Sequence, residues 1–280
     1  VHDSKLRYVL LMGGAGSGKS SDTAMNYILR LAGDGRRNLM CIRKSERSNR
    51  DSTYTELESA ARRLHLEELF TFSKSPLRIE CSNGARIIFR GVNDLKAREK
   101  RKSVTFAQGK LTDIWIEEAT EISSEDFEII DDRLRGELEQ GLFYQIKMTF
   151  NPVSGNSWIK KKFFDAKRDN ALCHHSTYKD NRFIDAEYHK RMEFRKETDP
   201  NGYKIYALGQ WGEMGGLILP HYEVKDFDNN ILNFDHVAYG QDFGFNHADA
   251  ILMVGFRDGN IYILREIYVR GMDTAEIIEL

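Results

Sequence analysis

Eight residues near the beginning of the chain have the types and spacing of a phosphate-binding loop. Residues 13–20 read GGAGSGKS and fit the pattern G-x-x-x-x-G-K-[ST]. Glycines let backbone N–H groups turn inward around phosphate oxygens, and the following helix N-terminus adds partial positive charge. We expect Lys19 to reach the β- and γ-phosphates of ATP, and the Ser20 hydroxyl to bind Mg²⁺. A glycine-rich turn that binds nothing is the alternative.

The whole loop is predicted to contact the nucleotide, with one acidic residue from further along the chain. These predicted ATP-binding residues are Gly13, Gly14, Ala15, Gly16, Ser17, Gly18, Lys19, Ser20 and Glu117.

Two carboxylates and an amide could complete the chemistry of ATP hydrolysis. Residues 112–119 read TDIWIEEA, so an apolar strand ends at Glu117 and Glu118. We expect Glu117 to contact Mg²⁺ through water and Glu118 to polarise the attacking water, although two surface acids would look the same. Residues 149–152 read TFNP and place Asn151 at the end of the next strand. There it would face the γ-phosphate, unless the segment is an ordinary turn.

Alternating strands and helices are predicted to position these groups. Apolar runs predict strands, and 3.6-residue periodicity predicts helices. Strands are expected at 8–12, 39–42, 77–81, 85–90, 114–116 and 144–150, and helices at 19–31, 53–70 and 127–138. This order predicts an α/β fold of the P-loop NTPase, RecA-like type, with a mostly parallel sheet and flanking helices. A ligand should lie beyond the carboxyl ends of the strands.

Composition divides the chain into parts. Residues 157–205 are strongly charged and are expected to be mostly helical, and a glycine-rich connector follows them. Strands are expected again at 236–241, 249–256 and 260–267. We therefore predict an ATPase domain over 1–208, a linker over 209–229 and the beginning of a second domain over 230–280.

The overall composition indicates a globular protein. Of 280 residues, 41% are hydrophobic and 30% are charged, which excludes collagen-like and wholly disordered chains. No apolar stretch approaches the roughly 20 residues that span a bilayer, so no membrane association is expected. The three cysteines, Cys41, Cys81 and Cys173, are widely spaced, which fits reduced thiols in a cytosolic protein.

Local basic clusters are the candidates for contact with nucleic acid, because the formal net charge is only −2. A solvated face is the favoured interpretation of each cluster, since acids are interspersed. The 96–102 run is the densest. The four clusters lie at 43–50, 96–102, 160–168 and 190–196.

Three motifs at these separations, GGAGSGKS, IWIEEA and TFNP, resemble the ATPase of the large terminase subunit of tailed bacteriophages. The connector YALGQWGEMGGLILP is similar to that family's inter-domain segment, and YGQDFGF resembles the opening strand of its RNase H-like nuclease. The resemblance implies a motor that translocates viral double-stranded DNA into a procapsid and cuts it with the second domain. It also implies that Asp242 binds Mg²⁺ or Mn²⁺ and is catalytic. Asp249 and Glu266 are further candidate ligands, or else ordinary strand residues.

The same resemblance implies partners and a location. We expect double-stranded DNA, the procapsid portal, a small terminase subunit and a homo-oligomeric ring of five subunits, working in the host cytoplasm. The remaining nuclease carboxylates are expected beyond Leu280, so this fragment is expected to lack nuclease activity. A helicase-like P-loop ATPase and a nucleotide-gated, non-enzymatic assembly protein are the alternatives.

The loop departs from the family at Ala15, where an arginine is common. Another arginine, in cis or from a neighbouring subunit, would then have to stabilise the transition state. The candidates are Arg43, Arg47, Arg50, Arg86 and Arg90.

Overall fold

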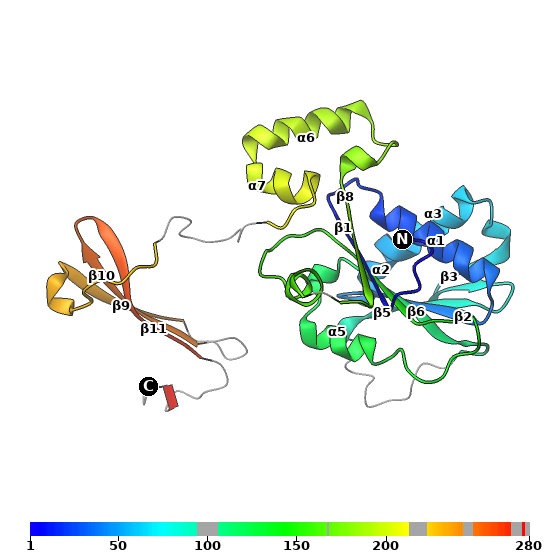
Figure 1. Ribbon diagram of the computed structural model, residues 1–280, viewed down its shortest axis with the longest axis horizontal. Helices are drawn as coiled ribbons and strands as arrows, with labels where there is room; N and C mark the ends of the chain where they lie inside the picture. The colour runs from blue at the N-terminus through cyan, green and yellow to red at the C-terminus, as the bar shows by residue number, and fades with distance from the viewer. Residues whose placement is uncertain (94–105, 167, 213–222, 243–248, 270–275, 278–280) are drawn as a thin grey trace. The chain divides into compact units, whose positions relative to one another are not determined.

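The computed structural model describes residues 1–93, 106–166, 168–212, 223–242, 249–269 and 276–277 (Figure 1). The chain divides into two compact units, Val1–Leu217 and Ile218–Leu280. Each unit is described by itself. The predicted basic loop at 96–102 and much of the predicted linker lie outside the described residues.

An eight-stranded, mostly parallel sheet forms the centre of the first unit, with the strand order β3-β4-β5-β2-β6-β7-β1-β8. Only β3-β4 and β4-β5 pair antiparallel, so the α/β prediction is confirmed. The strands are β1 (Tyr8–Gly13), β2 (Arg37–Arg43), β3 (Phe70–Lys74), β4 (Leu77–Cys81), β5 (Arg86–Gly91), β6 (Lys110–Glu117), β7 (Gln145–Phe150) and β8 (Ala171–Ser176).

Helices cover both faces of this sheet (Figure 1). One core contains α1 and α3, and the other contains α5 and η4. The α-helices are α1 (Lys19–Gly33), α2 (Glu46–Asn49), α3 (Thr55–Arg63), α5 (Ser124–Asp131), α6 (Ala186–Thr198) and α7 (Pro200–Gly202). The short π and 3₁₀ segments are η1 (Arg50–Tyr54), η2 (Glu67–Leu69), η3 (Ala119–Glu121), η4 (Lys160–Asp165), η5 (Tyr178–Asp180), η6 (Tyr203–Ala207) and η7 (Ile231–Asn233).

The strand β7 lies between β1 and β6, in parallel register with both. The carboxyl ends of these three strands therefore meet at one edge of the sheet. The loop at 14–18 follows β1, Glu117 ends β6, and Asn151 follows β7. This order places Asn151, just after β7, between the predicted phosphate-binding loop and the predicted Mg²⁺ carboxylate Glu117.

Two predicted helices are shorter than expected. The helix predicted over 53–70 ends at Arg63, and Phe70 instead pairs with Cys81 in the first sheet. The helix predicted over 127–138 is α5, which begins at Ser124 and ends at Asp131. Arg7 donates to the carbonyls of Asp131 and Leu134, so these carbonyls, which a longer helix would have paired internally, accept from a side chain distant in sequence.

The prediction that 157–205 is mostly helical is wrong for part of this segment. Residues Ala171–Ser176 form β8, which pairs parallel with β1 along its whole length. The segment ALCHHS has no apolar alternation, and β8 lies at an edge of the sheet with His174 and His175 exposed. Pairing with β1, and not hydrophobic pattern, makes it a strand.

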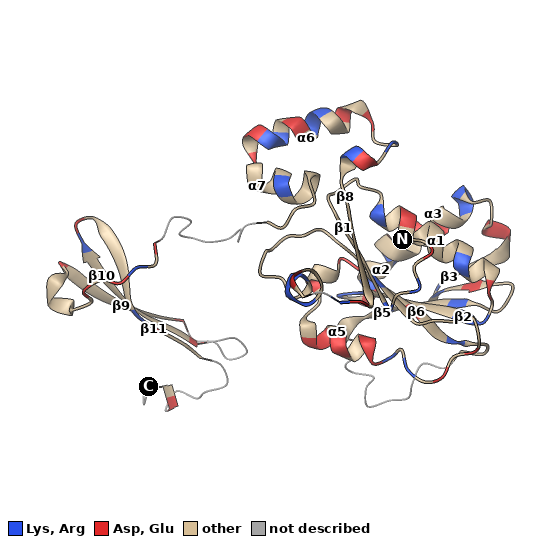
Figure 2. Ribbon diagram, viewed as in Figure 1, with Lys and Arg blue, Asp and Glu red and all other residues tan. Residues whose placement is uncertain are grey.

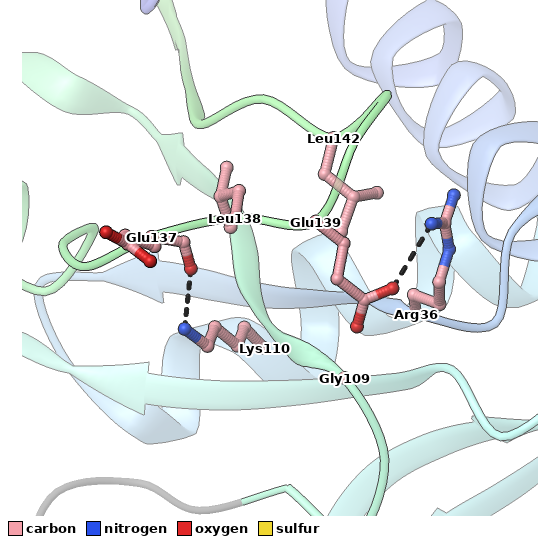
Figure 3. A pocket seen from close by; sticks show the side chains of 7 residues that line it. All are labelled: Arg36, Gly109, Lys110, Glu137, Leu138, Glu139 and Leu142. Atoms are coloured by element: carbon pink, nitrogen blue, oxygen red, sulfur yellow. Dashed lines mark hydrogen bonds and ion pairs between the residues drawn. The ribbon is translucent and has the colours of Figure 1, made fainter.

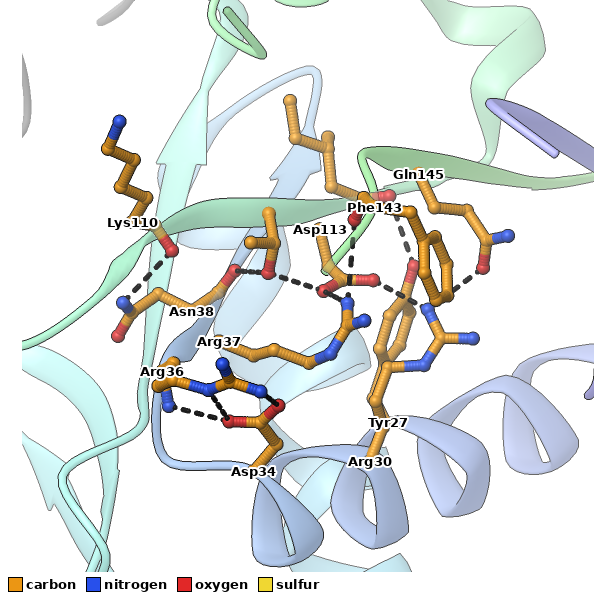
Figure 4. A network of polar contacts seen from close by, with 12 residues as sticks. Tyr27, Arg30, Asp34, Arg36, Arg37, Asn38, Lys110, Asp113, Phe143 and Gln145 are labelled. Atoms are coloured by element: carbon orange, nitrogen blue, oxygen red, sulfur yellow. Dashed lines mark hydrogen bonds and ion pairs between the residues drawn. The ribbon is translucent and has the colours of Figure 1, made fainter. Parts of the chain in front are cut away.

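A buried polar network joins α1 to the amino ends of β2, β6 and β7 (Figure 4). The Asp113 carboxylate is fully buried and accepts hydrogen bonds from Arg30 at 2.6 Å and Arg37 at 3.2 Å. Thr112 donates its hydroxyl to the same carboxylate at 2.7 Å, and Arg30 also donates to the Gln145 side chain at 2.9 Å. Every charge in this network is paired, which buried charges require.

Replacing Asp113 with Ala should lower the free energy of unfolding of the first unit by about 3–5 kcal/mol, because two guanidinium groups lose their buried anion. Urea unfolding followed by circular dichroism measures the change. Glu139→Ala is the control, since that side chain is 66% exposed in its pair with Arg36 and should contribute about 0–1 kcal/mol. An Asp113→Ala variant as stable as Glu139→Ala would contradict the assignment.

Lys147 is a buried cation in the middle of β7. Its Nζ atom donates to Asn26 Oδ1 on α1 and lies 5.0 Å from the centre of the Tyr27 ring. Burial, and then the nearby positive charge of Arg30, lower the pKa of Lys147 from 10.5 to about 8. Below pH 8 the folded and unfolded chains both carry this proton, and the folded chain holds a buried charge. Between pH 8 and 10.5 the folded chain loses the proton first, so stability attributable to Lys147 rises with pH.

A Lys147→Met variant should therefore be more stable than the wild type at pH 7, by about 1–3 kcal/mol. This advantage should shrink as the pH rises from 8 to 10, because the wild-type side chain becomes neutral. Urea unfolding at several pH values measures the difference. The exposed Lys190→Met variant should show no such trend, and an advantage of Lys147→Met that does not change with pH would refute the prediction.

The second unit contains a three-stranded antiparallel sheet with the order β11-β10-β9. Its strands are β9 (His236–Asp242), β10 (Asp249–Arg257) and β11 (Asn260–Val269), in the places that the sequence predicts. Asp258 and Gly259, both with positive φ, make the turn between β10 and β11. Among all described residues, none of the helices combines the length and apolar composition that a bilayer span needs.

Candidate nucleotide-binding site

The loop at 14–18 has the backbone of a phosphate-binding turn. Gly16 and Gly18 have φ values of +75° and +84°, a region that side-chain-bearing residues rarely adopt. The loop leads from the end of β1 directly into α1, which begins at Lys19. The unpaired N–H groups and positive end of the helix dipole therefore meet at this loop, which favours an anion.

Gly13 and Gly14 are required for close packing of the loop against neighbouring backbone. A Cβ atom on Gly13 would lie 2.4 Å from the carbonyl oxygen of Ser176, and one on Gly14 would lie 2.5 Å from that of Tyr206. Gly14 N–H donates to Ser176 at 3.3 Å, and Ala15 N–H donates to Tyr206 at 2.7 Å. The loop is thus backed by β8 and by η6.

Lys19 and Asn151 lie 132 positions apart in the chain, and the fold brings them into contact. Lys19 Nζ donates to Asn151 Oδ1 at 2.8 Å and to the Gly14 carbonyl at 3.1 Å. Burial lowers the pKa of Lys19, and the negative charges of Glu118 and Glu117 oppose that shift. The ammonium group is therefore partly desolvated, so a phosphate would bind it more strongly than in water.

Ser20 and Glu117, the two residues that the sequence assigns to Mg²⁺, also meet. The Ser20 hydroxyl donates to Glu117 Oε1 at 2.7 Å. Glu117 is only 8% exposed, and burial raises its pKa while hydrogen bonds from Thr149 and Ser20 lower it. A hydroxyl and a carboxylate at the mouth of a phosphate-binding loop are the oxygen ligands that Mg²⁺ prefers. These residues fit the metal expected here.

Glu118 adopts an unusual backbone conformation for a glutamate. Its φ is +53°, in the left-handed region. The residue is half-buried, and its negative charge adds to the raised pKa of Glu117 and opposes the lowering of the Lys19 pKa by burial. Glu118 therefore lies within electrostatic reach of both groups. Its role in polarising water stays a prediction.

The sequence interpretation missed several residues around the loop. Asn181 Nδ2 donates to the Gly16 carbonyl at 2.7 Å, and the Tyr188 hydroxyl donates to the Ala15 carbonyl at 2.9 Å. No local signal identifies them, because they lie more than 160 positions from the loop. Thr149, which donates to Glu117, is its partner in the parallel pair β6-β7, and that pairing is set by the folded sheet.

The candidate arginines differ in position. Arg43 ends β2 at the carboxyl edge of the sheet and pairs with Glu121 at 3.4 Å. Arg86 begins β5 at the opposite edge and pairs with Glu80 at 2.7 Å. Arg47 and Arg50 are exposed. The arginine that would replace the one absent at Ala15 stays a prediction.

The described basic clusters contain many neighbouring acids (Figure 2). Lys160 pairs with Asp165 at 2.7 Å, and Lys162 pairs with Glu128. Arg195 pairs with Asp199 at 2.9 Å. Parts of the 160–168 and 190–196 clusters therefore have local partners.

A separate pocket lies at the amino ends of β2 and β6 (Figure 3). Arg36 pairs there with Glu139 at 3.3 Å, and Lys110 donates to the Glu137 carbonyl at 2.6 Å. Because this pocket lies at the opposite edge of the sheet from the loop, the nucleotide is not assigned to it.

The candidate nuclease carboxylates lie on three different strands. Asp242 is exposed at the end of β9 and is paired in register with Ala250. Asp249 is buried at the start of β10, and Glu266 is exposed on β11. Within the described ranges, no three His, Cys, Asp or Glu residues gather into a possible metal site. Metal binding by Asp242 stays a prediction.

Comparisons with known proteins point in one direction. The family model of the phage terminase large subunit matches residues 5–210. The PBSX phage terminase large subunit of Bacillus subtilis is 32% identical over 292 residues, covering 95% of this chain and 65% of that protein. The terminase large subunit of Bacillus phage SPP1 is 30% identical over 274 residues, covering 94% of this chain and 64% of that protein. The chain thus spans slightly less than two thirds of the length of these two relatives.

Solved structures share the fold. The large terminase of a thermophilic bacteriophage superimposes with a TM-score of 0.61 at 15% identity, over 96% of this chain and 64% of that one. A structure of the same protein in complex with ADP gives a TM-score of 0.58, also at 15% identity.

Proposed function

The chain belongs to the phage terminase large subunit family, and from this premise we propose that it is an ATP-hydrolysing motor that translocates viral double-stranded DNA into a procapsid. One observation carries the proposal. The two contacts Lys19–Asn151 and Ser20–Glu117 meet at the carboxyl edge of the sheet, beside the phosphate-binding loop. The ADP complex of the structurally similar large terminase supports ATP as the nucleotide.

Each group has a defined task in the proposed reaction. The loop N–H groups and Lys19 hold the phosphates, and the charge of Lys19 stabilises negative charge that develops on the γ-phosphoryl group. Ser20 and Glu117 would hold Mg²⁺, which neutralises phosphate charge when bound. Glu118 orients and polarises the attacking water. Asn151, in contact with Lys19, reports the loss of the γ-phosphate to β7 and the chain beyond it.

The proposal extends to partners. A motor that handles any sequence must grip the DNA backbone, so phosphate contacts by Lys and Arg should make binding depend on salt and not on sequence. The portal of the procapsid, a small terminase subunit and a ring of five copies in the host cytoplasm complete the proposed machine. Asp242 in the second unit is the proposed first metal ligand of an endonuclease. We expect this chain by itself not to cleave plasmid DNA with Mn²⁺, and robust cutting that the Asp242→Ala variant abolishes would refute that expectation.

The decisive experiment measures ATP hydrolysis with and without double-stranded DNA, and then DNA encapsidation with cognate procapsids and small subunit. We expect ATP turnover that DNA and procapsids stimulate, and DNA protected from nuclease inside the capsid. ATP binding without any hydrolysis under these conditions would favour a nucleotide-gated assembly protein. Strand displacement of a partial duplex would favour a helicase. Either result would overturn the proposal.

A further inference from the structure

The proposed Mg²⁺ ligand Glu117 is held by a neighbour that the motif does not include. Glu117 and Thr149 are opposite residues in the parallel pair β6-β7. The Thr149 hydroxyl donates to Glu117 Oε2, while Ser20 donates to the other carboxylate oxygen. Thr149 is 1% exposed, so water does not compete for this contact. Both oxygens of the carboxylate are therefore fixed from the protein side.

Trp115 fixes the direction of the Thr149 hydrogen bond. The Trp115 indole nitrogen donates to Thr149 Oγ at 2.8 Å, and the ring is fully buried. An indole N–H can only donate, so the threonine oxygen must accept from it. The single hydroxyl proton of Thr149 is then left for Glu117 Oε2 or for the Ile116 carbonyl at 3.4 Å, and the charged carboxylate is the stronger acceptor. Trp115 lies two residues before Glu117 on β6, so it points to the same face of the sheet.

We propose that Thr149, oriented by Trp115, is a positioning residue that presents Glu117 to Mg²⁺. The inference rests on the proposed ATPase function of the site. Residues that hydrogen-bond a metal ligand fix its rotamer and raise its affinity for the metal. Without the Thr149 hydroxyl, the Glu117 carboxylate keeps only the Ser20 contact and can rotate away from the loop. In this proposal Thr149 acts only through Glu117.

The test compares Thr149→Val with Thr149→Ser in the whole chain. Valine keeps the volume and removes the hydroxyl, and serine keeps the hydroxyl. Two quantities are measured: the Mg²⁺ concentration at half-maximal ATP turnover, and the affinity for a fluorescent ADP analogue in Mg²⁺ or in EDTA. For Thr149→Val we expect the half-saturating Mg²⁺ concentration to rise about 10–100-fold, with turnover recovering at high Mg²⁺. Affinity in EDTA should not change, and Thr149→Ser should behave like the wild type.

Two further variants separate positioning from folding. Thr112→Val makes the same change at a buried threonine of the neighbouring strand β6. Thr112 lies near the amino edge of the sheet, so this variant should leave the Mg²⁺ dependence unchanged. Trp115→Phe keeps Thr149 but removes the indole N–H, and should shift the Mg²⁺ dependence in the same direction as Thr149→Val by a smaller factor.

The outcomes are distinguishable from failure of the proposed function. If the wild type hydrolyses ATP and Thr149→Val shows unchanged Mg²⁺ dependence in both measurements, the positioning role is overturned and the ATPase proposal stands. An equal effect of Thr112→Val would also overturn the positioning role, because the effect would then be structural. A wild type that neither binds nor hydrolyses ATP would overturn both.

Discussion

A Glu118→Gln variant should bind ATP normally and hydrolyse it about 10²–10⁴ times more slowly than the wild type. Glutamine has nearly the same shape but cannot accept a proton from the attacking water. The residue follows the Glu117 strand end in a left-handed conformation, and its charge acts on Lys19. Steady-state phosphate release measures turnover, and a fluorescent ATP analogue measures affinity.

Glu121→Gln is the matched control for that experiment. Glu121 ends the short segment η3 that Glu118 precedes, and it pairs with Arg43. Its substitution should leave turnover close to the wild-type value. Retention of full turnover by Glu118→Gln would remove this residue from the catalytic assignment and would leave the role of base to another group.

Removal of Lys19 should have the second large effect. In a Lys19→Ala variant, ATP hydrolysis should fall about 10²–10³-fold, because a charge that stabilises the transferring phosphoryl group is lost. ATP should also no longer raise the melting temperature, since ligand stabilisation depends on affinity for the folded state. The protein without nucleotide should be no less stable than the wild type, because burial of the Lys19 ammonium group lowers its pKa and disfavours its charged form.

Differential scanning fluorimetry with and without Mg²⁺ and ATP measures both parts of this prediction. Lys110→Ala is the control: Lys110 is exposed at the amino edge of the same sheet and should keep the nucleotide-dependent rise. A Lys19→Ala protein that is still stabilised by ATP to the wild-type extent would show that nucleotide binds elsewhere.

Strand sequences and glycine positions predicted the strands and the loop whose conformation depends on their own residues. The apolar runs in β1 and β6 are buried on both faces, and β7 alternates apolar and polar residues, so their sequences identify them as strands without knowledge of their neighbours. The glycines of the loop identify a backbone that only glycine adopts easily. Edge strand β8 has neither signal, and its strand conformation depends on pairing with β1.

The sequence by itself determined that a P-loop NTPase sheet was present, and which side chains could hold phosphate and Mg²⁺. Those side chains belong to short motifs whose residue types and spacing are constrained by the ligand chemistry. Only the tertiary structure decided which groups touch. Inserting β7 between β1 and β6 brings Asn151 to Lys19 and Thr149 to Glu117, and β8 and η6 close behind the loop at Gly13 and Gly14. Strand order is a property of the folded sheet, and no local pattern in the chain encodes it.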